Sequence, residues 1–399
     1  MTSRKQIAIL GSTGSIGVST LDVVARHPDQ FEVFALTAST RVDDMLAQCV
    51  RFKPAFAVMA SPPHGLQLQQ RCAAAGLATR VLLGPDAIAA VARDERVDIV
   101  MAAIVGAAGL ASCMAAALAG KRLLLANKEA LVVGAEVFLT AVRTGGAKLL
   151  PIDSEHSAIF QSLPDDATSW PQVIDKLLLT ASGGPFHARD PATLRDVTSE
   201  QACSHPNWVM GRKISVDSAT MMNKALEVIE ARYLFGVLPQ QIDVVIHPQS
   251  VIHSMVQYRD NSIVAQMGTA DMRVPIAYGL SWPARMESGA QALDFQALTA
   301  LTFESCESAG HQARFPGLRL AWQVLGSPVG TPAILNAANE VAVDAFLDRR
   351  IRFDQIHAVN QSTLAAVQAC GADTLEGLLA LDNRARRVAG DWVHKFGPA

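Results

Sequence analysis

Three polar side chains recur at helical spacing in the segment 215–230, which reads Ser-Val-Asp-Ser-Ala-Thr-Met-Met-Asn-Lys-Ala-Leu-Glu-Val-Ile-Glu. If an amphipathic helix starts near Ser218, then Asn223, Glu227 and Glu230 fall at i, i+4 and i+7 and share one face. A face of this kind can hold a cation or a polar ligand. The sequence therefore predicts a binding surface on this helix.

A second acidic pair follows a strand-like segment, where Asp153 and Glu155 are separated by one residue. Residues i and i+2 of an extended backbone point to the same side, so both carboxylates can grip one cation. Together with Glu227 they offer three carboxylates and no sulfur, which suits Mg²⁺ or Mn²⁺ rather than zinc. We expect His156 to be a neighbour of this site rather than a ligand. The alternative for the pair is a helix N-terminus, where the dipole favours acids.

An anion site is expected beside these acids. Ser182-Gly-Gly184 follows another strand-like segment and offers a hydroxyl and exposed amides to an anion. Ser218, Asn223 and Lys224 can complete a phosphate pocket, with the lysine acting as a point charge. Because Lys224 stands three residues before Glu227, a plain ion pair on a solvated helix face is the alternative.

A long loop, 185–214, lies between these segments and contains His205-Pro-Asn-Trp208-Val-Met-Gly211. Loops of this length inside a compact domain are usually lids or binding loops. Trp208 can close over a small ligand and exclude water. A tryptophan that anchors the loop to the body of the domain is the alternative.

A glycine-rich turn, Gly11-Ser-Thr-Gly14-Ser-Ile-Gly17, comes directly after the first strand-like segment. Such glycines let backbone amides approach a pyrophosphate at a helix N-terminus, and a plain tight turn is the alternative. After the second strand-like segment no acid occurs before Asp43, whereas Arg41 is present. An arginine there accommodates a 2′-phosphate, which favours NADP over NAD unless Arg41 is an ordinary surface residue.

The elements around these residues alternate between strand-like and helix-like segments over the first 150 residues. They are 6–10, 18–26, 31–36, 42–50, 55–58, 66–75, 80–83 and 86–92, followed by a strand at 99–102, a glycine-rich turn, a short helix and a strand at 122–126. This order predicts an α/β fold with an N-terminal, doubly wound, Rossmann-like parallel sheet.

The pattern changes after residue 150. Strands are expected at 176–181 and 242–246, and the segments 251–258 and 262–267 predict a hairpin. We therefore predict an NADPH-binding domain at 1–150 and a central mixed α/β catalytic domain at 151–285. An irregular linker at 286–331 and a C-terminal helical domain at 332–399 follow.

Composition excludes several classes of protein. The net charge of −3 over 399 residues gives no basic field for a nucleic acid. The charge-free stretch 99–120 parses as strand, turn and short helix rather than as a membrane span. No export signal is expected at the N-terminus, and the scattered cysteines favour buried thiols in a reducing cytoplasm. These are Cys49, Cys72, Cys113, Cys203, Cys306 and Cys370.

Taken together, these motifs resemble the 1-deoxy-D-xylulose 5-phosphate reductoisomerase family over nearly the whole chain. The residues that carry the resemblance also include Ala126-Asn-Lys-Glu129, Met210-Gly-Arg-Lys-Ile-Ser and His247-Pro-Gln-Ser-Val-Ile-His253. The resemblance implies an NADPH- and metal-dependent rearrangement and reduction that makes 2-C-methyl-D-erythritol 4-phosphate for isoprenoid precursors. It also implies a cytoplasmic enzyme, and we expect a homodimer that binds neither nucleic acid nor membrane.

The resemblance also implies roles for individual residues. Asp153, Glu155 and Glu227 would hold Mg²⁺ or Mn²⁺. The substrate would be contacted by Lys128, Ser154, Glu155, Ser182, His205, Trp208, Ser218, Asn223, Lys224 and Glu227. NADPH would be contacted by Thr13, Gly14, Ser15, Ile16, Asn127, Glu129 and Gly211. From the glycine turn and the end of the second strand-like segment we also expect contacts from Gly11, Gly17, Ala38, Ser39, Thr40 and Arg41. Many members have an asparagine-containing loop where this chain has Ala38-Ser-Thr-Arg41.

We expect the catalytic residues to be Lys128, Asp153, Glu155, His205 and Glu227. Lys128, Glu155 and bound water all stay open as the general base, and the rearrangement can proceed by fragmentation and aldol re-addition or by a direct shift. Two other readings also stay open. One is a metal-free NADP-dependent dehydrogenase of the semialdehyde or homoserine type, and the other is a non-catalytic NADP sensor.

Overall fold

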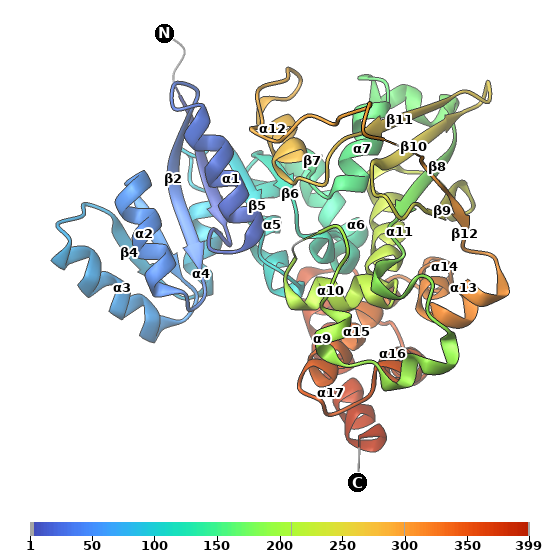
Figure 1. The fold of residues 1–399 in the computed structure, drawn as a ribbon. Helices are drawn as coiled ribbons and strands as arrows, with labels where there is room; N and C mark the ends of the chain where they lie inside the picture. Colours follow the sequence, from blue (N-terminus) through green and yellow to red (C-terminus); the bar gives the residue numbers. More distant parts are fainter. Residues whose placement is uncertain (1–3, 209, 299, 398–399) are drawn as a thin grey trace. The chain divides into compact units, whose positions relative to one another are not determined.

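The protein forms two compact units in a computed structural model that describes residues 4–208, 210–298 and 300–397 (Figure 1). Unit 1 comprises Met1–Ala130, Phe138–Asp153 and Asp271–Ala290. Unit 2 comprises Leu131–Val137, Ser154–Ala270 and Gln291–Ala399. The units interleave along the chain, whereas sequence reasoning placed contiguous domains. The predicted domain boundaries at 150, 285 and 331 stay predictions.

Unit 1 is built on a parallel sheet with the strand order β4-β3-β2-β1-β5-β6-β7. The strands are β1 (Lys5–Leu10), β2 (Phe31–Ala38), β3 (Phe56–Met59), β4 (Arg80–Leu83), β5 (Ile99–Ala102), β6 (Arg122–Leu125) and β7 (Lys148–Pro151). Ile7, Ile9 and Met101 are fully buried, as expected for strands covered on both faces. The predicted doubly wound parallel sheet is confirmed. Its order reverses between β1 and β5, where such folds bind ligands.

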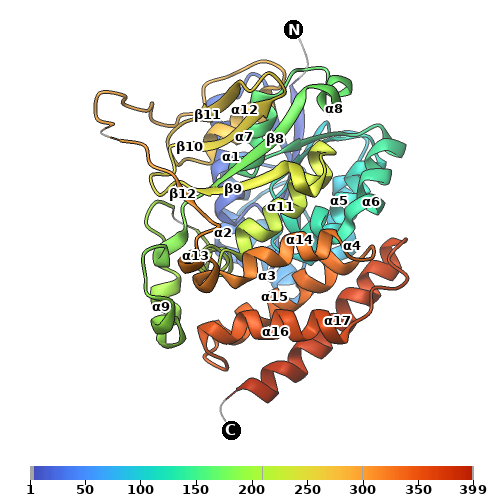
Figure 2. The same ribbon diagram turned by 90° about the vertical axis from the view of Figure 1, so that its right-hand side faces the viewer.

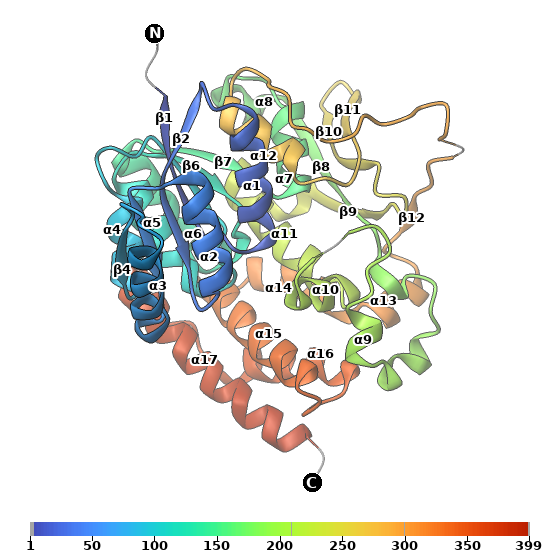
Figure 3. The same ribbon diagram turned by 60° about the vertical axis from the view of Figure 1, so that its left-hand side comes forward.

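The helices of unit 1 follow the strands, and one of them comes from a distant part of the chain. They are α1 (Ser15–Arg26), α2 (Val42–Phe52), α3 (Pro62–Ala74), α4 (Pro85–Ala92), α5 (Leu110–Leu118), α6 (Lys128–Gly145) and α12 (Arg273–Ser281), with the 3₁₀ turn η1 (Ala107–Gly109). Figure 3 shows α12 beside α1. Arg273 of α12 forms an ion pair with Asp22 of α1 at 3.1 Å.

The charge-free stretch 99–120 folds as β5, η1 and α5, as predicted. Among the residues that the structure describes, no helix has both the length and the apolar character needed to cross a bilayer. Helix α6 is interrupted at Ala135, whose φ of 43° and ψ of −128° are not helical. Residues Leu131–Val137 around this interruption belong to unit 2.

Unit 2 contains a mixed sheet with the order β11-β10-β8-β9-β12. The strands are β8 (Ile174–Ala181), β9 (Ile242–Ile246), β10 (Ile252–Tyr258), β11 (Ile263–Met267) and β12 (Glu304–Ser305). Strands β10 and β11 form the predicted antiparallel hairpin, whose turn is closed by a bond from Tyr258 N to Ser262 O at 2.9 Å. Because β8 and β9 are parallel, the loops after both strands leave the same edge of the sheet.

Helix α11 (Met222–Phe235) packs on this sheet and carries much of the core of unit 2. The predicted single helix from Ser218 is wrong in detail. A first helix, α10 (Arg212–Ala219), ends there, and Met221 adopts a left-handed conformation with φ of 60° before α11 begins. The chain therefore turns between Ser218 and Asn223. These two residues lie on different helices.

The C-terminal helices α15 (Thr331–Leu347), α16 (Phe353–Ala366) and α17 (Leu375–Phe396) pack together, as predicted for a helical domain (Figure 2). The expected linker 286–331 is more ordered than predicted. It contains α13 (Ala309–Arg314), η6 (Pro316–Arg319) and α14 (Leu320–Leu325), and it buries Phe315 and Val324 in the core with α11. The helices of this stretch are six residues long or shorter, so no long helical period marks them in the sequence.

The remaining elements of unit 2 are short. They are α7 (Ser154–Ser162), η2 (Ala167–Ser169), α8 (Trp170–Val173), η3 (Gly184–Phe186), η4 (Pro191–Asp196), α9 (Ser199–Ala202) and η5 (Pro239–Gln241). Helix α7 packs against the β10–β11 hairpin.

The glycine turn supplies a test of the fold. A Cβ atom on Gly17 would lie 2.5 Å from the Gly11 carbonyl oxygen, whereas a Cβ on Gly14 would lie 3.4 Å from the same atom. Backbone atoms cannot move aside cheaply, so Gly17→Ala should lower the free energy of unfolding by about 1–3 kcal/mol. Gly14→Ala is the matched control and should change it much less. Urea unfolding of both variants measures the difference, and equal losses would contradict this account of the turn.

Candidate active site

The glycine turn lies where the first sheet reverses its strand order. Gly11 follows β1 with a φ of 83°, and a Cβ there would lie 2.6 Å from the carbonyl oxygen of Ala103, the residue after β5. Gly14 caps α1 and lends no side chain to its first turn. The amides of that turn, from Ser15 to Gly17, are therefore placed to receive an anion. This geometry suits the predicted pyrophosphate site.

Arg41 lies beside the same turn, because its Nη1 donates a hydrogen bond to the Thr13 carbonyl oxygen at 3.1 Å. Ser39 and Thr40 are exposed next to it, and Ala38 ends β2. The side chain of Arg41 is largely exposed, so its guanidinium can reach a ligand at the end of β2.

Asn127 has a structural task in the same unit. Its Oδ1 caps α6 by accepting from Ala130 N at 2.9 Å, and its Nδ2 donates to the carbonyl oxygens of Ile104 and Gly106. Asn127 therefore fixes the loop after β5. Glu129 is buried on the first turn of α6. Contact of Asn127 and Glu129 with a cofactor stays a prediction.

Three carboxylates come together at the start of α7. Asp153 directly precedes this helix and Glu155 is its second residue, so the continuous chain holds the two side by side. Glu227, one turn into α11, completes the group, and the three oxygens lie within 4.8 Å of one another. All the donor atoms are carboxylate oxygens, so the donor set fits a hard divalent cation.

Two ammonium groups neutralise part of this charge. Lys224 Nζ lies 2.7 Å from Glu155 Oε1 and also contacts Glu227, while Lys128 is paired with Asp153. Burial by itself would lower the pKa of Lys224, but the carboxylates of Glu155 and Glu227 outweigh it and raise the pKa above its usual value. Lys224 is therefore charged, and it occupies the place where a metal ion would neutralise the same carboxylates.

One hydroxyl group and one side-chain amide also donate hydrogen bonds to the carboxylates of the cluster. Ser154 Oγ donates to Glu155 Oε2 at 2.6 Å, and the Asn223 amide donates to Glu227 Oε1. Sequence reasoning expected Asn223 and Lys224 at a phosphate. In this arrangement both side chains are bonded to carboxylates.

His156 contacts the backbone of Glu227, a member of the cluster, and the side chain of Glu230. Its Nε2 lies 2.9 Å from the Glu227 carbonyl oxygen, and its Nδ1 lies 3.2 Å from Glu230 Oε2. His156 and Glu230 are fully buried. These contacts join α7 to α11 next to Glu227. Glu230, expected on one binding face with Asn223 and Glu227, is instead the buried partner of His156.

Ser182 and His205 form the centre of a candidate anion site. Nδ1 of His205 accepts backbone N–H bonds from Asn207 at 3.2 Å and Trp208 at 3.0 Å, so this nitrogen carries no proton. Burial lowers the pKa of His205, which keeps the ring neutral. Its Nε2–H therefore donates to Ser182 Oγ at 2.9 Å. Since Gly184 N also donates to this oxygen, at 3.1 Å, the Ser182 hydroxyl has its proton to offer to a ligand.

The Ser182-Gly-Gly turn packs directly on α10. A Cβ on Gly184 would lie 2.6 Å from the Ser218 carbonyl oxygen, so only glycine allows this approach. Gly184 also has a φ of 66°, a conformation that favours glycine. Ser182 and Ser218 are therefore held on neighbouring segments, as the predicted phosphate pocket requires.

Much of the expected loop 185–214 is ordered and packed. It contains part of η3, η4 and α9, and it buries Phe186, Leu194 and Val197 in a core shared with Phe346 and Phe353 of the helical bundle. The longest stretch without helix is 203–211, in which Val209 lies outside the described residues. The expectation of one long structureless loop is wrong because its apolar residues face the C-terminal helices.

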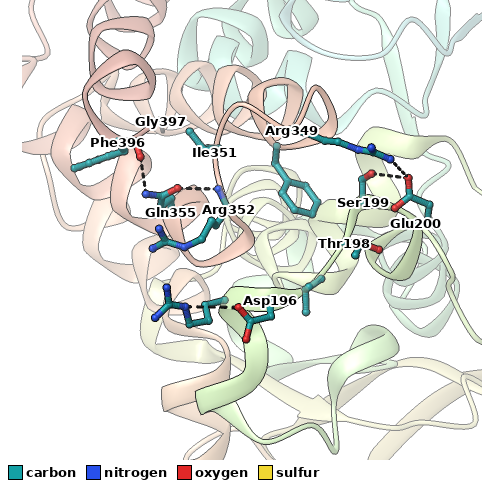
Figure 4. A pocket seen from close by; sticks show the side chains of 13 residues that line it. Asp196, Thr198, Ser199, Glu200, Arg349, Ile351, Arg352, Gln355, Phe396 and Gly397 are labelled. Atoms are coloured by element: carbon teal, nitrogen blue, oxygen red, sulfur yellow. Dashed lines mark hydrogen bonds and ion pairs between the residues drawn. The ribbon is translucent and has the colours of Figure 1, made fainter. Parts of the chain in front are cut away.

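A hollow beside α9 shows how this first part of the loop is fixed (Figure 4). Glu200 Oε1 accepts from Arg349 Nη2 at 2.8 Å, and Gln355 Nε2 donates to the Phe396 carbonyl oxygen at 2.7 Å. The cations that line the hollow are paired with acids. It offers no concentrated charge to a ligand.

Trp208 lies in the remaining stretch, and its ring centre is 6.1 Å from that of His253. Asn207 Nδ2 donates to the Pro248 carbonyl oxygen at 2.7 Å. Sequence reasoning assigned no role to His253, although the motif that contains it was noted. Gly211 caps α10 with open space around it. Closure of Trp208 over a ligand and contact of Gly211 with a cofactor stay predictions.

The carboxylate cluster predicts a metal affinity that depends on Glu227. Glu227→Gln removes one of three charged ligands, and we expect Mn²⁺ binding to weaken at least tenfold, since even changes behind a metal site cost that much. Titration calorimetry with Mn²⁺ measures the effect. Glu304→Gln is the control, because Glu304 pairs with His311 at 3.1 Å. Unchanged Mn²⁺ affinity in Glu227→Gln would remove Glu227 from the ligand set.

Comparison with known proteins gives one consistent result. Family models described as 1-deoxy-D-xylulose 5-phosphate reductoisomerase match residues 7–135, and those of its C-terminal domains match 149–235 and 267–388. A protein of that name from Cupriavidus metallidurans is 56% identical over 96% of this chain and 97% of its own. One from Pseudomonas paraeruginosa is 54% identical over 99% and 100%.

Solved structures agree with this. A DOX-P reductoisomerase in complex with NADPH, fosmidomycin and magnesium is 44% identical, with a TM-score of 0.94 over 99% of this chain and 100% of its own. The Zymomonas mobilis enzyme in complex with NADPH is 42% identical, with a TM-score of 0.90 over 98% and 99%. The chain belongs to the 1-deoxy-D-xylulose 5-phosphate reductoisomerase family.

Proposed function

We propose that this chain converts 1-deoxy-D-xylulose 5-phosphate to 2-C-methyl-D-erythritol 4-phosphate with NADPH and a divalent cation, in the synthesis of isoprenoid precursors. The observation that carries the proposal is the group of three carboxylate oxygens within 4.8 Å of one another. Such a group favours the binding of a divalent cation. Family membership supports the choice of substrate and of cofactor.

We propose Asp153, Glu155 and Glu227 as the ligands of Mg²⁺ or Mn²⁺. When bound, the cation supplies a positive charge that polarises the substrate carbonyl and stabilises negative charge on oxygen, while NADPH supplies the hydride. The protein's own contribution is to hold three acids in a partly buried site whose ligand atoms are all oxygens. His156 supports this arrangement through its contact with the Glu227 carbonyl oxygen.

Lys224 is proposed to change partners when the cation binds. Its ammonium lies 2.7 Å from Glu155 and contacts Glu227, so a divalent ion on these carboxylates competes with it directly. A displaced Lys224, with Asn223 on the same turn of α11, can then donate to the substrate. Lys128 and Ser154, which are bonded to Asp153 and Glu155, are proposed to contact the substrate beside the metal.

The substrate phosphate is proposed to bind between Ser182 and Ser218. His205 accepts two backbone N–H bonds and donates to Ser182, so the serine hydroxyl is oriented before the substrate arrives. Binding energy at this remote phosphate can then hold the reacting carbonyl in place. Trp208 is proposed to close over the bound substrate and exclude water.

NADPH is proposed to bind at the glycine turn of unit 1, with its pyrophosphate on the first turn of α1. Arg41 is proposed to contact the 2′-phosphate, since it already lies against the Thr13 carbonyl oxygen. The remaining proposed contacts are Gly11, Gly14, Ser15, Ile16, Gly17, Ala38, Ser39, Thr40, Asn127, Glu129 and Gly211.

We further propose a homodimer in the cytoplasm. Ile263 and Val264 are 52% and 44% exposed on β11, the edge strand of the second sheet, and apolar edge strands tend to pair. All six cysteines are free, which fits a reducing compartment.

An NADPH-oxidation assay on 1-deoxy-D-xylulose 5-phosphate tests the function. We expect turnover that EDTA abolishes and that Mg²⁺ or Mn²⁺ restores, because the three carboxylates would bind the substrate oxygens only through the cation. EDTA-resistant turnover would favour a metal-free dehydrogenase. Cofactor binding without oxidation of NADPH would favour a non-catalytic sensor.

His205 gives a second test. His205→Ala removes the donor that orients Ser182, and one such bond contributes about 1 kcal/mol, so KM for the sugar phosphate should rise roughly fivefold to tenfold with a smaller change in kcat. Steady-state kinetics measure both constants. The matched control is His64→Ala, which breaks another serine–histidine pair, to Ser61 at 2.7 Å. A wild-type KM in His205→Ala would count against the phosphate site.

A further inference from the structure

A buried carboxylate that the proposed chemistry does not use lies on α10, next to Ser218. Asp217 is 1% exposed, and its Oδ2 accepts from Lys213 Nζ at 2.9 Å. Its Oδ1 accepts from Asn339 Nδ2 of α15 at 2.7 Å. Asn360 of α16 in turn donates to Asn339 Oδ1 at 3.2 Å. A chain of buried polar groups thus runs from the helical bundle to α10.

Apolar packing alone would hold α10 against the helical bundle, without the hydrogen bonds among Asp217, Asn339 and Asn360. Val216 and Ala219 of α10 share a core with Ala338 and Ala342 of α15, and all four are fully buried. Small residues let the two helices approach closely, but they do not fix how far one slides along the other. A buried charge with directional partners fixes that register, at a desolvation cost that apolar residues would avoid.

The position of α10 along α15 matters because the same turn of α10 also packs against the Ser182-Gly-Gly turn. Gly184 packs on the Ser218 carbonyl oxygen so closely that a Cβ would come to 2.6 Å. Gly184 N also donates to Ser182 Oγ. A slide of α10 by a fraction of an ångström would therefore disturb the Ser182 turn as well as Ser218.

We infer that Asn339 is a positioning residue for phosphate binding. It acts through Asp217 to set the position of Ser218 and, through Gly184, of Ser182. The C-terminal helices thereby determine the affinity for the phosphate end of the substrate, although Asn339 itself touches no substrate. The inference rests on the proposed phosphate site between Ser182 and Ser218.

The test compares two asparagines of one helix. Asn339→Ala removes the bond to Asp217, whereas Asn336→Ala removes an equally buried asparagine whose amide donates to Glu340 of the same helix at 2.9 Å. We expect Asn339→Ala to raise KM for 1-deoxy-D-xylulose 5-phosphate about tenfold, and to raise the inhibition constant of inorganic phosphate by the same factor. KM for NADPH and the affinity for Mn²⁺ should stay within twofold. Asn336→Ala should leave all four constants within twofold, even if its melting temperature falls as far as that of Asn339→Ala.

A purely structural role gives a different result. Equal changes of KM in both variants, or a lowered melting temperature without a change of KM in Asn339→Ala, would overturn the inference. If Asn339→Ala does not fold, Asn360→Ala replaces it, since it removes only the hydrogen bond to Asn339 Oδ1. A smaller rise of the same two constants is then expected, and no rise overturns the inference.

Ser218→Ala separates this inference from the phosphate site on which it rests. An unchanged KM in Ser218→Ala means that the phosphate site itself is wrong, and the inference falls with it. A raised KM in Ser218→Ala together with a wild-type KM in Asn339→Ala leaves the phosphate site standing and overturns the role of Asn339 alone.

Discussion

Mutual repulsion among three acids is the constraint around which the site is built. Carboxylates within 4.8 Å of one another in a largely buried setting repel unless cations lie among them. Lys128 and Lys224 provide two positive charges beside the three negative ones, and a divalent ion that displaced Lys224 would make the total neutral. Within unit 2, the start of α7 and the first turns of α11 must therefore lie close together, which the contact of His156 with the Glu227 carbonyl oxygen supports.

In both sheets, the proposed binding groups lie in the loops that follow neighbouring parallel strands. In the first sheet, the residues after the parallel strands β1 and β5 approach so closely that Gly11 tolerates no side chain. In the second, the parallel strands β8 and β9 place Ser182 and His247 at one edge, where His247 N donates to the Ala181 carbonyl oxygen at 2.7 Å. Exposed backbone amides at such edges bind anions with little help from charged side chains. This explains how a chain of net charge −3 can bind phosphates.

Local signals made a large part of this structure predictable. The parallel sheet, the β10–β11 hairpin and the glycine turn follow from apolar runs and glycines that act within a few residues. The break between α10 and α11 at Met221 could not be predicted, because methionine is not a residue type that favours the left-handed conformation. The packed half of the loop 185–214 was missed because Leu194 and Val197 find their partners on distant helices. The proton position on His205 depends on the loop conformation that brings the N–H groups of Asn207 and Trp208 to Nδ1, which residue spacing cannot reveal.

The order in which the chain is synthesised has a consequence for unit 1. Helix α12 packs on β6 and β7, and Gly279 lies so close to Ile152 and Leu124 that a Cβ would come within 2.7 and 3.1 Å of their side chains. On the ribosome, β1 to β7 emerge long before α12 does. One face of the nascent sheet therefore stays partly uncovered while the segment Ser154–Ala270 of unit 2 is translated. A chaperone that shields apolar surface, or rapid folding of the intervening segment, would protect that face until the helix arrives.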